Sequence, residues 1–453
     1  MESSLSSPAL EIQPFGAPAP IIPIALQKIS KQSIRTSLQA STLDGVLAVI
    51  FSATTGGVLL TNFLLQLGAT PVEIGLLSSI PMLVNLLQPG GAYIADRTTS
   101  RHNYCLWIFG VSRLLWAILL VGIAWFSWSH TDLHQLVFWT LGIILATNIL
   151  GALGSSAWFS WMAALVPPRL RGRYFSLRNS AASLTNLLSV PFLGFVVSAW
   201  SCETNGYGVV LLLGIVAGIA SLGFQFLMTD VNPQRPQATA LYKSKVQSSS
   251  LNQEENAQSQ LPKVSIFTDT NFLRFLLYFG LWMFAVNLSA PFFNLYLLDN
   301  LALNLKWVTI YTSLISGANL VMLILWGKLA DRVGNRPLLL LVGIIVAVTP
   351  LLWLSAGTNS VYLWVWLPLI HILTGGAGAA VDLCGSNIQM ELAPVDRPSK
   401  YFAFAAAVGG IGGGLGATAG GLAQLDYIGG LPGLFDLSAA VRLIALLPLV
   451  CVL

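Results

Sequence analysis

The chain has 453 residues, of which 55% are hydrophobic and 9% are charged. Soluble domains carry about 25% charged residues, so this composition excludes an ordinary soluble protein and places the chain in a lipid bilayer. A formal net charge of +4, with no basic stretch that interleaves aromatic residues, argues against a nucleic-acid partner. The four cysteines are scattered without C-x-x-C spacing, so neither a disulfide framework nor a structural metal site is predicted.

Twelve apolar runs are long enough to cross the membrane as helices, which takes roughly 20 residues for roughly 30 Å of hydrocarbon. The first six cover 43–66, 73–94, 104–127, 135–165, 179–200 and 207–228, and the last six cover 271–298, 307–327, 337–356, 361–391, 401–424 and 433–453. The sequence therefore predicts an all-α integral membrane protein with two pseudo-symmetric halves of six transmembrane helices each.

Polar segments divide the chain into four parts. Residues 1–42 form a tail with Pro, Ser and Gln, and residues 229–270 form a linker rich in Gln and Ser. The N-terminal half is therefore expected at 43–228 and the C-terminal half at 271–453. The tail lacks the apolar core and cleavage site of a signal peptide, so we expect it to be cytosolic.

The distribution of cations predicts the orientation in the membrane. Of the 22 Lys and Arg residues, all but Lys306, Arg113 and Arg442 fall in or beside the tail, the linker and the even-numbered loops. Cationic loops stay on the cytosolic side, so both termini are predicted to be cytosolic. We expect a multi-pass protein of the plasma (inner) membrane.

One charged loop sequence recurs after the second run of each half. The stretch GAYIADRTTSR at 91–101 corresponds to GKLADRVGNR at 327–336. This correspondence pairs Ala92 with Gly327, Asp96 with Asp331, Arg97 with Arg332 and Arg101 with Arg336. A duplicated six-helix unit is typical of secondary transporters built from repeats.

A second pair of loops follows the fourth run of each half. VPPRLRGRYF at 166–175 aligns without gaps with APVDRPSKYF at 393–402. The cations of these loops are Arg169, Arg171 and Arg173 in the first copy and Arg397 and Lys400 in the second.

GKLADRVGNR resembles the loop signature G-x-x-x-D-R-x-G-x-R of the major facilitator superfamily. The first copy matches it less closely, because Ala92 and Thr99 replace the two glycines. The resemblance covers residues 40–453 and points to an uncharacterised or drug-efflux-like branch. It implies a permease that moves a small-molecule solute by alternating access, coupled to a proton gradient. We expect a monomer that is not an enzyme, with no catalytic residue, no cofactor and no bound metal.

The charged loops have a physical role in such a protein. A small residue at Gly327 lets two helices approach closely, Asp331 can cap a helix N-terminus, and Arg332 and Arg336 offer donors to carboxylates or carbonyls. By resemblance, the loop clamps the cytosolic side in the outward-facing state. The alternative is a solvated turn that only sets topology.

The resemblance also implies that runs one, four, seven and ten line a central cavity. The polar candidates for solute contact on those runs are Asn62, Asn148, Asn287 and Asn294, with the hydroxyls of Thr54 and Thr55 beside them. For each of them, a hydrogen bond between helices is the alternative.

His371 begins HILTGGAGAA, which resembles the R-x-x-Q-G-x-G motif of drug and sugar transporters with histidine in place of arginine. It lies ~15 Å inside its run, where an imidazole can accept a proton. A neutral histidine bonded to a neighbouring helix is the alternative. The first half has Thr147 at the corresponding place and no arginine, so the coupling mechanism stays open.

Charged residues inside the runs need partners, because an isolated charge at the bilayer centre costs roughly 2.5 to 3.5 kcal/mol. Arg113 and Asp382 are candidates for either a functional or a structural role. Arg442 lies in the last run, and Asp44 and Glu391 lie near cytosolic ends, where they can reach water or a loop arginine.

Three further patterns are weaker. LLSVPFLGFV in the fifth run keeps Pro191 and Gly194 of the drug-antiporter pattern but lacks two of its glycines, and the eleventh run is dense in glycine. HTDLH, with His130, Asp132 and His134, is expected to be a polar turn rather than a metal site. A transport-inactive sensor, or an uptake facilitator in place of an exporter, is the alternative to active transport.

Overall fold

The computed structural model describes residues 30–98, 100–129, 134–166, 171–200, 203–231, 269–392, 398–423 and 429–450. Arg169 and Arg397, together with His130 and Asp132, lie outside the described residues. So do most of the predicted tail and linker.

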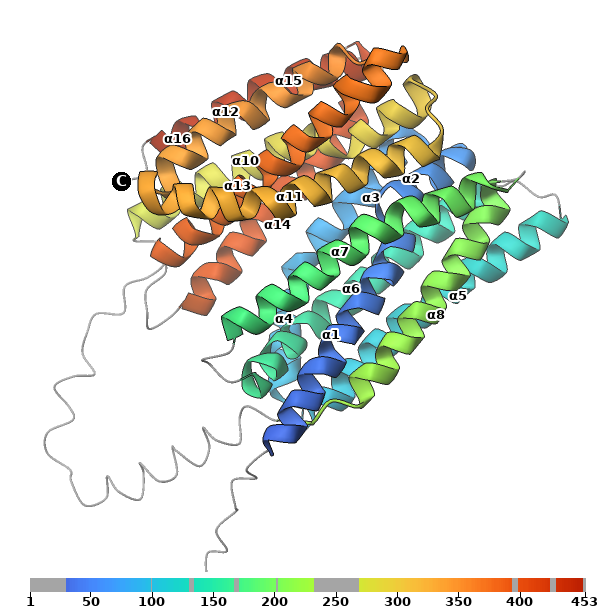
Figure 1. Cartoon of the computed structure of the whole chain (residues 1–453), viewed down its shortest axis with the longest axis vertical. Coiled ribbons are helices and arrows are strands. Elements are labelled where there is room, and N and C mark those ends of the chain that lie inside the picture. The colour runs from blue at the N-terminus through green and yellow to red at the C-terminus, as the bar shows by residue number, and fades with distance from the viewer. Residues whose placement is uncertain are drawn as a thin grey trace, which may run out of the picture.

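Long helices of the two halves lie side by side, with the C-terminal half uppermost in Figure 1. The N-terminal half contains α1 (Lys31–Thr54), α2 (Gly57–Gln66), α3 (Pro71–Val84), the 3₁₀ turn η1 (Asn85–Leu87), α4 (Gln88–Asp96), α5 (Arg101–Ser129), α6 (Gln135–Leu165), α7 (Arg171–Ser198) and α8 (Glu203–Phe226). The C-terminal half contains α10 (Thr270–Leu295), the π-helical turn η5 (Tyr296–Asn300), α11 (Leu305–Val333), α12 (Asn335–Leu354), the π-helical turn η6 (Tyr362–Trp366), α13 (Leu367–Leu392), α14 (Pro398–Ala423), α15 (Gly430–Ala445) and α16 (Leu447–Val450).

A helical segment lies at each of the twelve predicted positions, which confirms the predicted fold class. Eleven of the described segments are long and apolar enough to cross a membrane. The remaining position, the eleventh predicted run, is occupied by α14, which packs between α10 and α3. Several predicted runs consist of two helices because a local break interrupts them.

The break between α1 and α2 follows from two consecutive glycines. Gly57 has φ +60°, a left-handed conformation that glycine adopts readily. Between α2 and α3, the N-terminus of α3 is closed by a capping box, in which the Thr70 backbone N–H donates to Glu73 at 2.7 Å. Pro81 lies inside α3, and the helix passes into the 3₁₀ turn η1 soon after it.

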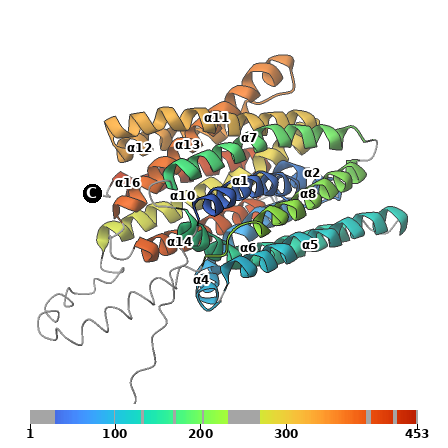
Figure 2. The ribbon, with the colours of Figure 1, turned by 60° about the horizontal axis from the view of Figure 1, so that its bottom comes forward.

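Two helix pairs make the most extensive contacts between the halves: α3 with α14, and α7 with α11, which run side by side in Figure 2. Glycine lets the two helices of the first pair, α3 and α14, pack closely. A Cβ added to Gly75 would lie 2.7 Å from the carbonyl oxygen of Ala417, so the two backbones touch at this point. The second pair is held by polar contacts, including Asn186 Nδ2 donating to Ser316 Oγ at 3.2 Å.

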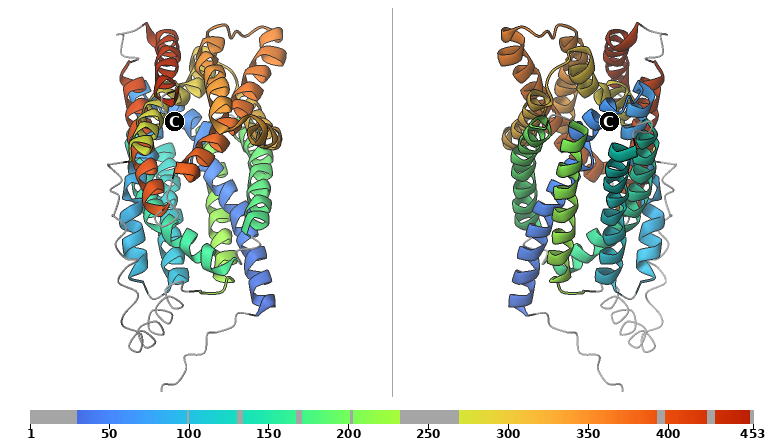
Figure 3. Two further views of the ribbon diagram at one scale, coloured as in Figure 1. Left: turned by 90° about the vertical axis from the view of Figure 1, so that its left-hand side faces the viewer. Right: turned by 90° about the vertical axis from the view of Figure 1, so that its right-hand side faces the viewer.

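The two ends of the bundle are packed differently. We call the end where α1 begins and α8 ends the linker end, and the end where α2 meets α3 the far end; α1 and α8 run beside each other in Figure 3. At the far end one apolar core contains residues of both halves, such as Phe63 and Phe292. At the linker end each half has its own core, around Trp161 in the first and Phe275 in the second. The halves are therefore packed together only toward the far end.

Candidate functional site: a central cavity with two lobes

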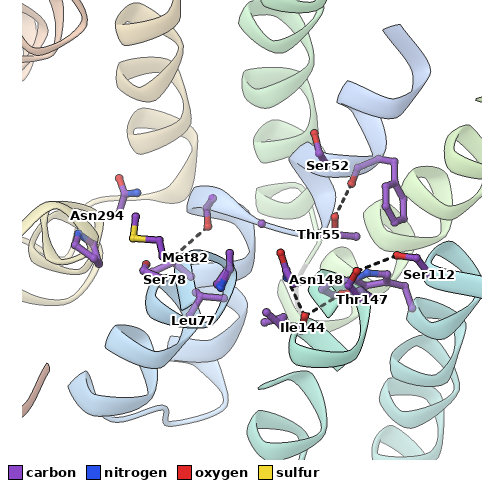
Figure 4. Close-up of a pocket in the computed structure, with 17 residues that line it drawn as sticks. Ser52, Thr55, Leu77, Ser78, Met82, Ser112, Ile144, Thr147, Asn148 and Asn294 are labelled. Atoms are coloured by element: carbon purple, nitrogen blue, oxygen red, sulfur yellow. Dashed lines mark hydrogen bonds between the residues drawn. The ribbon is translucent and has the colours of Figure 1, made fainter. Parts of the chain in front are cut away.

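A cavity of about 500 Å³ lies at the middle of the bundle, between α10 and helices of the N-terminal half. We call it the N-lobe. Figure 4 shows Ser112, Thr147 and Asn148 on one side of it and Met82 and Asn294 on the other. The lining carries hydroxyl and amide groups and no charged side chain: Ser52, Thr55, Thr61, Ser78, Ser112, Thr147, Asn148 and Asn294.

Most donors of the N-lobe are occupied by the protein itself. Asn148 Nδ2 donates to the carbonyl oxygen of Ile144 at 2.8 Å, and Thr55 Oγ1 donates to that of Phe51 at 3.0 Å. Ser52 and Thr147 donate to backbone carbonyls in the same way. Each hydroxyl and amide oxygen still has a lone pair, so this lobe offers mainly hydrogen-bond acceptors to a solute.

A second cavity of about 450 Å³ lies between α3 and the helices α10, α11, α12, α13 and α15. We call it the C-lobe. Met82 and Asn294 line both cavities, so they are two lobes of one central space. The walls of the C-lobe are aromatic, with Trp282, Phe293 and Trp353, and it contains three ionisable side chains, His371, Asp382 and Arg442.

His371 is 2% exposed and sits in an aromatic enclosure. Its ring centroid lies 5.2 Å from that of Tyr311 and 5.1 Å from that of Trp353. Nδ1 lies 2.6 Å from the carbonyl oxygen of Leu367. A carbonyl oxygen can only accept, so Nδ1 carries the hydrogen and Nε2 holds the free lone pair.

Arg442 is also 2% exposed and bridges three helices. From α15, its Nη1 donates to the carbonyl oxygen of Val346 on α12 at 2.8 Å. Its Nη2 donates to Ser289 Oγ at 2.8 Å and to the carbonyl oxygen of Val286 at 3.1 Å, both on α10. Its Nε has no hydrogen-bond partner.

The structure brings five of the seven predicted solute and proton candidates to the cavity. Asn148 lines the N-lobe, Asn294 lines both lobes, and the C-lobe holds Asn287, His371 and Asp382.

The other two candidates lie away from the cavity lining. Asn62 is buried on α2 in the far-end core. Arg113 Nη1 donates to the carbonyl oxygen of Gly218 on α8 at 2.7 Å, and Arg113 lines neither lobe. Of the two hydroxyls predicted beside Asn62, Thr55 lines the N-lobe, and Thr54 is buried against Gly214.

The second charged loop differs from its predicted role in this state. A Cβ on Gly327 would meet nothing within 4 Å, so no helix approaches closely there. Asp331 and Arg332 are exposed near the end of α11. Gly334, with φ +93°, ends α11 and precedes α12 without a side-chain cap, so Asp331 does not cap that helix. Arg336 is half-buried at the start of α12.

The first charged loop is also longer than the second. It spans 97–100 between α4 and α5, whereas Gly334 alone separates α11 from α12. Arg97 stacks on Tyr93, with 4.3 Å from its guanidinium carbon to the ring centroid, and Arg101 is buried at the start of α5. Ala92 and Asp96 belong to α4, Arg171 and Arg173 to α7, and Lys400 to α14.

His134 has a structural partner at the far end. Its Nε2 lies 3.3 Å from Glu73 Oε1, which ties the start of α6 to the start of α3. Among the residues that the structure describes, no group of three His, Cys, Asp or Glu side chains could hold a metal ion.

Sequence reasoning missed the cavity residues outside runs one, four, seven and ten. They include Ser78 and Met82 on run two, Ser112 on run three, Thr312 on run eight, Thr349 and Trp353 on run nine and Arg442 on run twelve. A Ser or Thr inside an apolar helix bonds to its own backbone whether or not it faces a cavity, so the sequence carried no signal for the hydroxyls.

The sequence profile of the Major Facilitator Superfamily matches residues 45–417 and, in a second match, 313–453. The chain belongs to this superfamily. It is therefore a membrane protein that transports solutes, and its two halves of six helices are those of the superfamily fold.

Solved structures of this fold superpose on nearly the whole chain. A D-xylose–proton symporter superposes with a TM-score of 0.67 at 16% identity, over 92% of this chain and 97% of its own. The nucleoside transporter NupG superposes with a TM-score of 0.63 at 14% identity, over 93% of this chain and 98% of its own. At such identities the likeness shows the fold alone.

One curated relative is similar in sequence. Sodium-dependent phosphate transport protein 1 of Rattus norvegicus is 23% identical over 275 residues, which is 57% of this chain. The match spans 55% of that relative, or about half its length.

Proposed function

We propose that this protein is a secondary active transporter that moves a small organic solute across the plasma (inner) membrane by alternating access. One observation carries the proposal: the halves share a core at the far end and have separate cores at the linker end, with the cavity between them. A carrier sealed on one side of a central site is one of the two states that alternating access requires.

The cations favour a cytosolic linker end. Lys and Arg residues cluster in the tail, the linker and the loops at this end, as the positive-inside rule expects of cytosolic segments. In this orientation both termini are cytosolic, and the described state faces inward.

The charged loops would act in the opposite state. Asp331 and Arg332 are exposed here, where the linker end is open. Closing that end brings the loops of the two halves toward each other, and their charges can then pair with helix ends or with opposite charges. Asp331→Asn should therefore increase the fraction of molecules that are open at the linker end.

A proton is the proposed coupling ion, because Nε2 of His371 is a proton acceptor on the cavity wall. The solute and the proton would then share one cavity in a single protomer. If uptake of a compound panel into proteoliposomes does not respond to an imposed pH gradient, the protein is a facilitator and not an active transporter.

Access to the cavity from each side tests alternating access without knowledge of the solute. Asn294→Cys, in a background with the four native cysteines replaced by serine, places a thiol where the two lobes meet. A membrane-impermeant thiol reagent added to one side at a time should label it from both sides. Ser79→Cys is the control, because Ser79 on α3 is fully buried and outside both lobes. Labelling of Asn294→Cys from the linker side only would contradict alternation and favour a static receptor.

A further inference from the structure

Each half of the molecule buries one arginine where its first, third and sixth helices meet. In the N-terminal half, Arg113 comes from the third helix, α5, and donates to Gly218 of the sixth helix, α8. In the C-terminal half, Arg442 comes from the sixth helix, α15, and donates to Val346 of the third helix, α12. Each half thus has a guanidinium at the same three-helix junction. The third helix supplies it in the N-terminal half, and the sixth helix supplies it in the C-terminal half.

The two arginines differ in their counter-ions. Asp44 on α1 lies within electrostatic reach of Arg113 and accepts a hydrogen bond from Ser221 Oγ at 2.6 Å. At the equivalent junction, the first helix of the C-terminal half presents Ser289 to Arg442. In the part of the chain that the structure describes, Arg442 has no carboxylate within ion-pairing distance.

Arg442 therefore carries a buried charge that forms no ion pair with a carboxylate of the described residues. Removing a cation from water without a counter-charge is unfavourable, and neutral carbonyls offset only part of the lost hydration. Its Nε–H also lacks a hydrogen-bond partner, although it is buried. The Arg442 side chain therefore has both a hydrogen-bond donor without a partner and a charge without a paired carboxylate among the described residues.

The two arginines also differ in access. Arg442 lines the C-lobe, whereas Arg113 and Asp44 line neither lobe. A counter-ion for Arg442 can therefore arrive from the cavity, and one for Arg113 cannot.

We propose that Arg442 binds the carboxylate of a monoanionic organic solute in the C-lobe. The proposal rests on the proposed transport function and names the substrate class. One guanidinium in a lobe that also contains Asp382 suits a single negative charge, whereas a phosphate monoester brings about −1.5 to −2. The aromatic walls formed by Trp282, Phe293 and Trp353 suit an apolar body next to that carboxylate. The acceptors of the N-lobe would receive the donors of such a solute.

Binding of benzoate to the purified full-length protein tests the proposal without a transport assay. Benzoate should raise the melting temperature of the wild type, and benzamide, which has the same ring without the charge, should not. Arg442→Gln should lose about tenfold or more in apparent benzoate affinity, as expected for a lost hydrogen bond to a charged group. Arg442→Lys should keep part of it, because the charge remains.

Arg113→Gln is the matched control, because Arg113 is also a buried arginine but lies outside the cavity, and the benzoate affinity of this variant should equal that of the wild type. The proposal is overturned if benzoate and benzamide act alike on the wild type, or if Arg442→Gln keeps wild-type benzoate affinity. A shift with inorganic phosphate and none with benzoate also overturns it. The outcome is independent of whether Asn294→Cys is labelled from both sides, so failure here is distinguishable from failure of the transport proposal.

Discussion

His371 is held in one tautomer by its own helix. The Leu367 carbonyl fixes the hydrogen on Nδ1, and two aromatic rings fix the plane of the imidazole. Protonation at Nε2 would place a positive charge on the same lobe wall as Arg442. Two like charges there would strengthen the hold on an anion, so the protonation state of His371 can be linked to solute binding.

Replacing His371 tests this link. His371→Asn keeps a side-chain donor but removes the proton acceptor Nε2, so labelling of Asn294→Cys should lose the part of its pH dependence that comes from this histidine. Labelling rates in acidic and alkaline buffer measure the effect, once each is divided by the rate of a free thiol in the same buffer, because the thiolate is the reacting form. His134→Asn is the control, because His134 lies at the far end against Glu73. An unchanged pH dependence in His371→Asn would rule out this histidine as the proton site.

At the scale of elements, α14 is the helix with the most direct backbone packing. A Cβ on Gly412, Gly416 or Gly420 would overlap the carbonyl oxygens of Gly280, Phe284 and Leu288 on α10. The spacing of four residues puts these glycines on one face of the helix. A different face, which includes Ala417 and Gly421, packs on α3 of the other half. One face of α14 therefore stabilises its own half, and another forms the contact between halves.

The face toward α10 should be sensitive to a single methyl group. Gly416→Ala forces α14 away from α10 and should lower stability by about 1–3 kcal/mol, the usual cost of overpacking. Thermal unfolding in detergent measures it. Gly385→Ala on α13 is the control, since a Cβ there meets nothing within 4 Å. Equal melting temperatures for the two variants would contradict the packing argument.

We expect the face of α14 that packs on α3 to control access to the cavity from the far end, and not the stability of the fold. Gly75→Ala inserts a methyl group between α3 and α14 near the far end, where the backbone of Ala417 leaves no room. The state sealed at the far end should become less populated, and far-side labelling of Asn294→Cys should rise. Gly90→Ala, in open space on α4, is the control and should label like the parent. A fall in far-side labelling would reverse the predicted direction.

The elements were predictable from the sequence to different degrees. Run length and hydrophobicity were enough to locate the helices, because the bilayer imposes both. The internal breaks were not predicted: a glycine pair such as Gly56 and Gly57 is compatible with either a close helix contact or a turn. The role of Gly327 was predicted from the resemblance, and a Cβ there meets nothing within 4 Å in this structure, so that role stays a prediction.

At the scale of the whole molecule, the two halves are packed together at the far end, and the proposed transport requires this contact to open. Ser198 Oγ on α7 lies 3.2 Å from Asn304 Oδ1 at the start of α11, across the boundary between halves. Asn387 Nδ2 lies 2.9 Å from Asn335 Oδ1, with both residues in the C-terminal half. The first pair must separate if the far end opens, and the second pair need not.

Cross-linking these two pairs tests the motion of the halves. A short thiol cross-link between Ser198→Cys and Asn304→Cys should reduce far-side labelling of Asn294→Cys to background and leave linker-side labelling intact. A cross-link between Asn335→Cys and Asn387→Cys should leave labelling from both sides unchanged. If the first cross-link has no effect on far-side labelling, the halves do not separate at this boundary.

The cavity was only partly predictable because it is a property of the assembled helices. Asn294 and His371 were found through the resemblance, which names the helices that line the cavity. Arg442 was not among the predicted solute contacts, because nothing in the sequence of its run indicates that three helices converge on it. The pairing of Arg113 with Asp44 likewise joins residues that are far apart along the chain.

Gly57 divides the first transmembrane segment into two parts with different attachments. The part before it, α1, packs on α7 and α8 of its own half, whereas α2 also packs on α10 and α11 of the other half. A straight helix could not stay packed on both halves as they separate. The rotation would therefore occur mainly in the turn at Thr55–Gly57, which also lines the N-lobe. The turn would then act as a hinge, and its angle would set how closely Thr55 contacts a bound solute. Spin labels on α1 and α2 would record that angle directly, and a constant distance between them through the cycle would show that the segment moves as one piece.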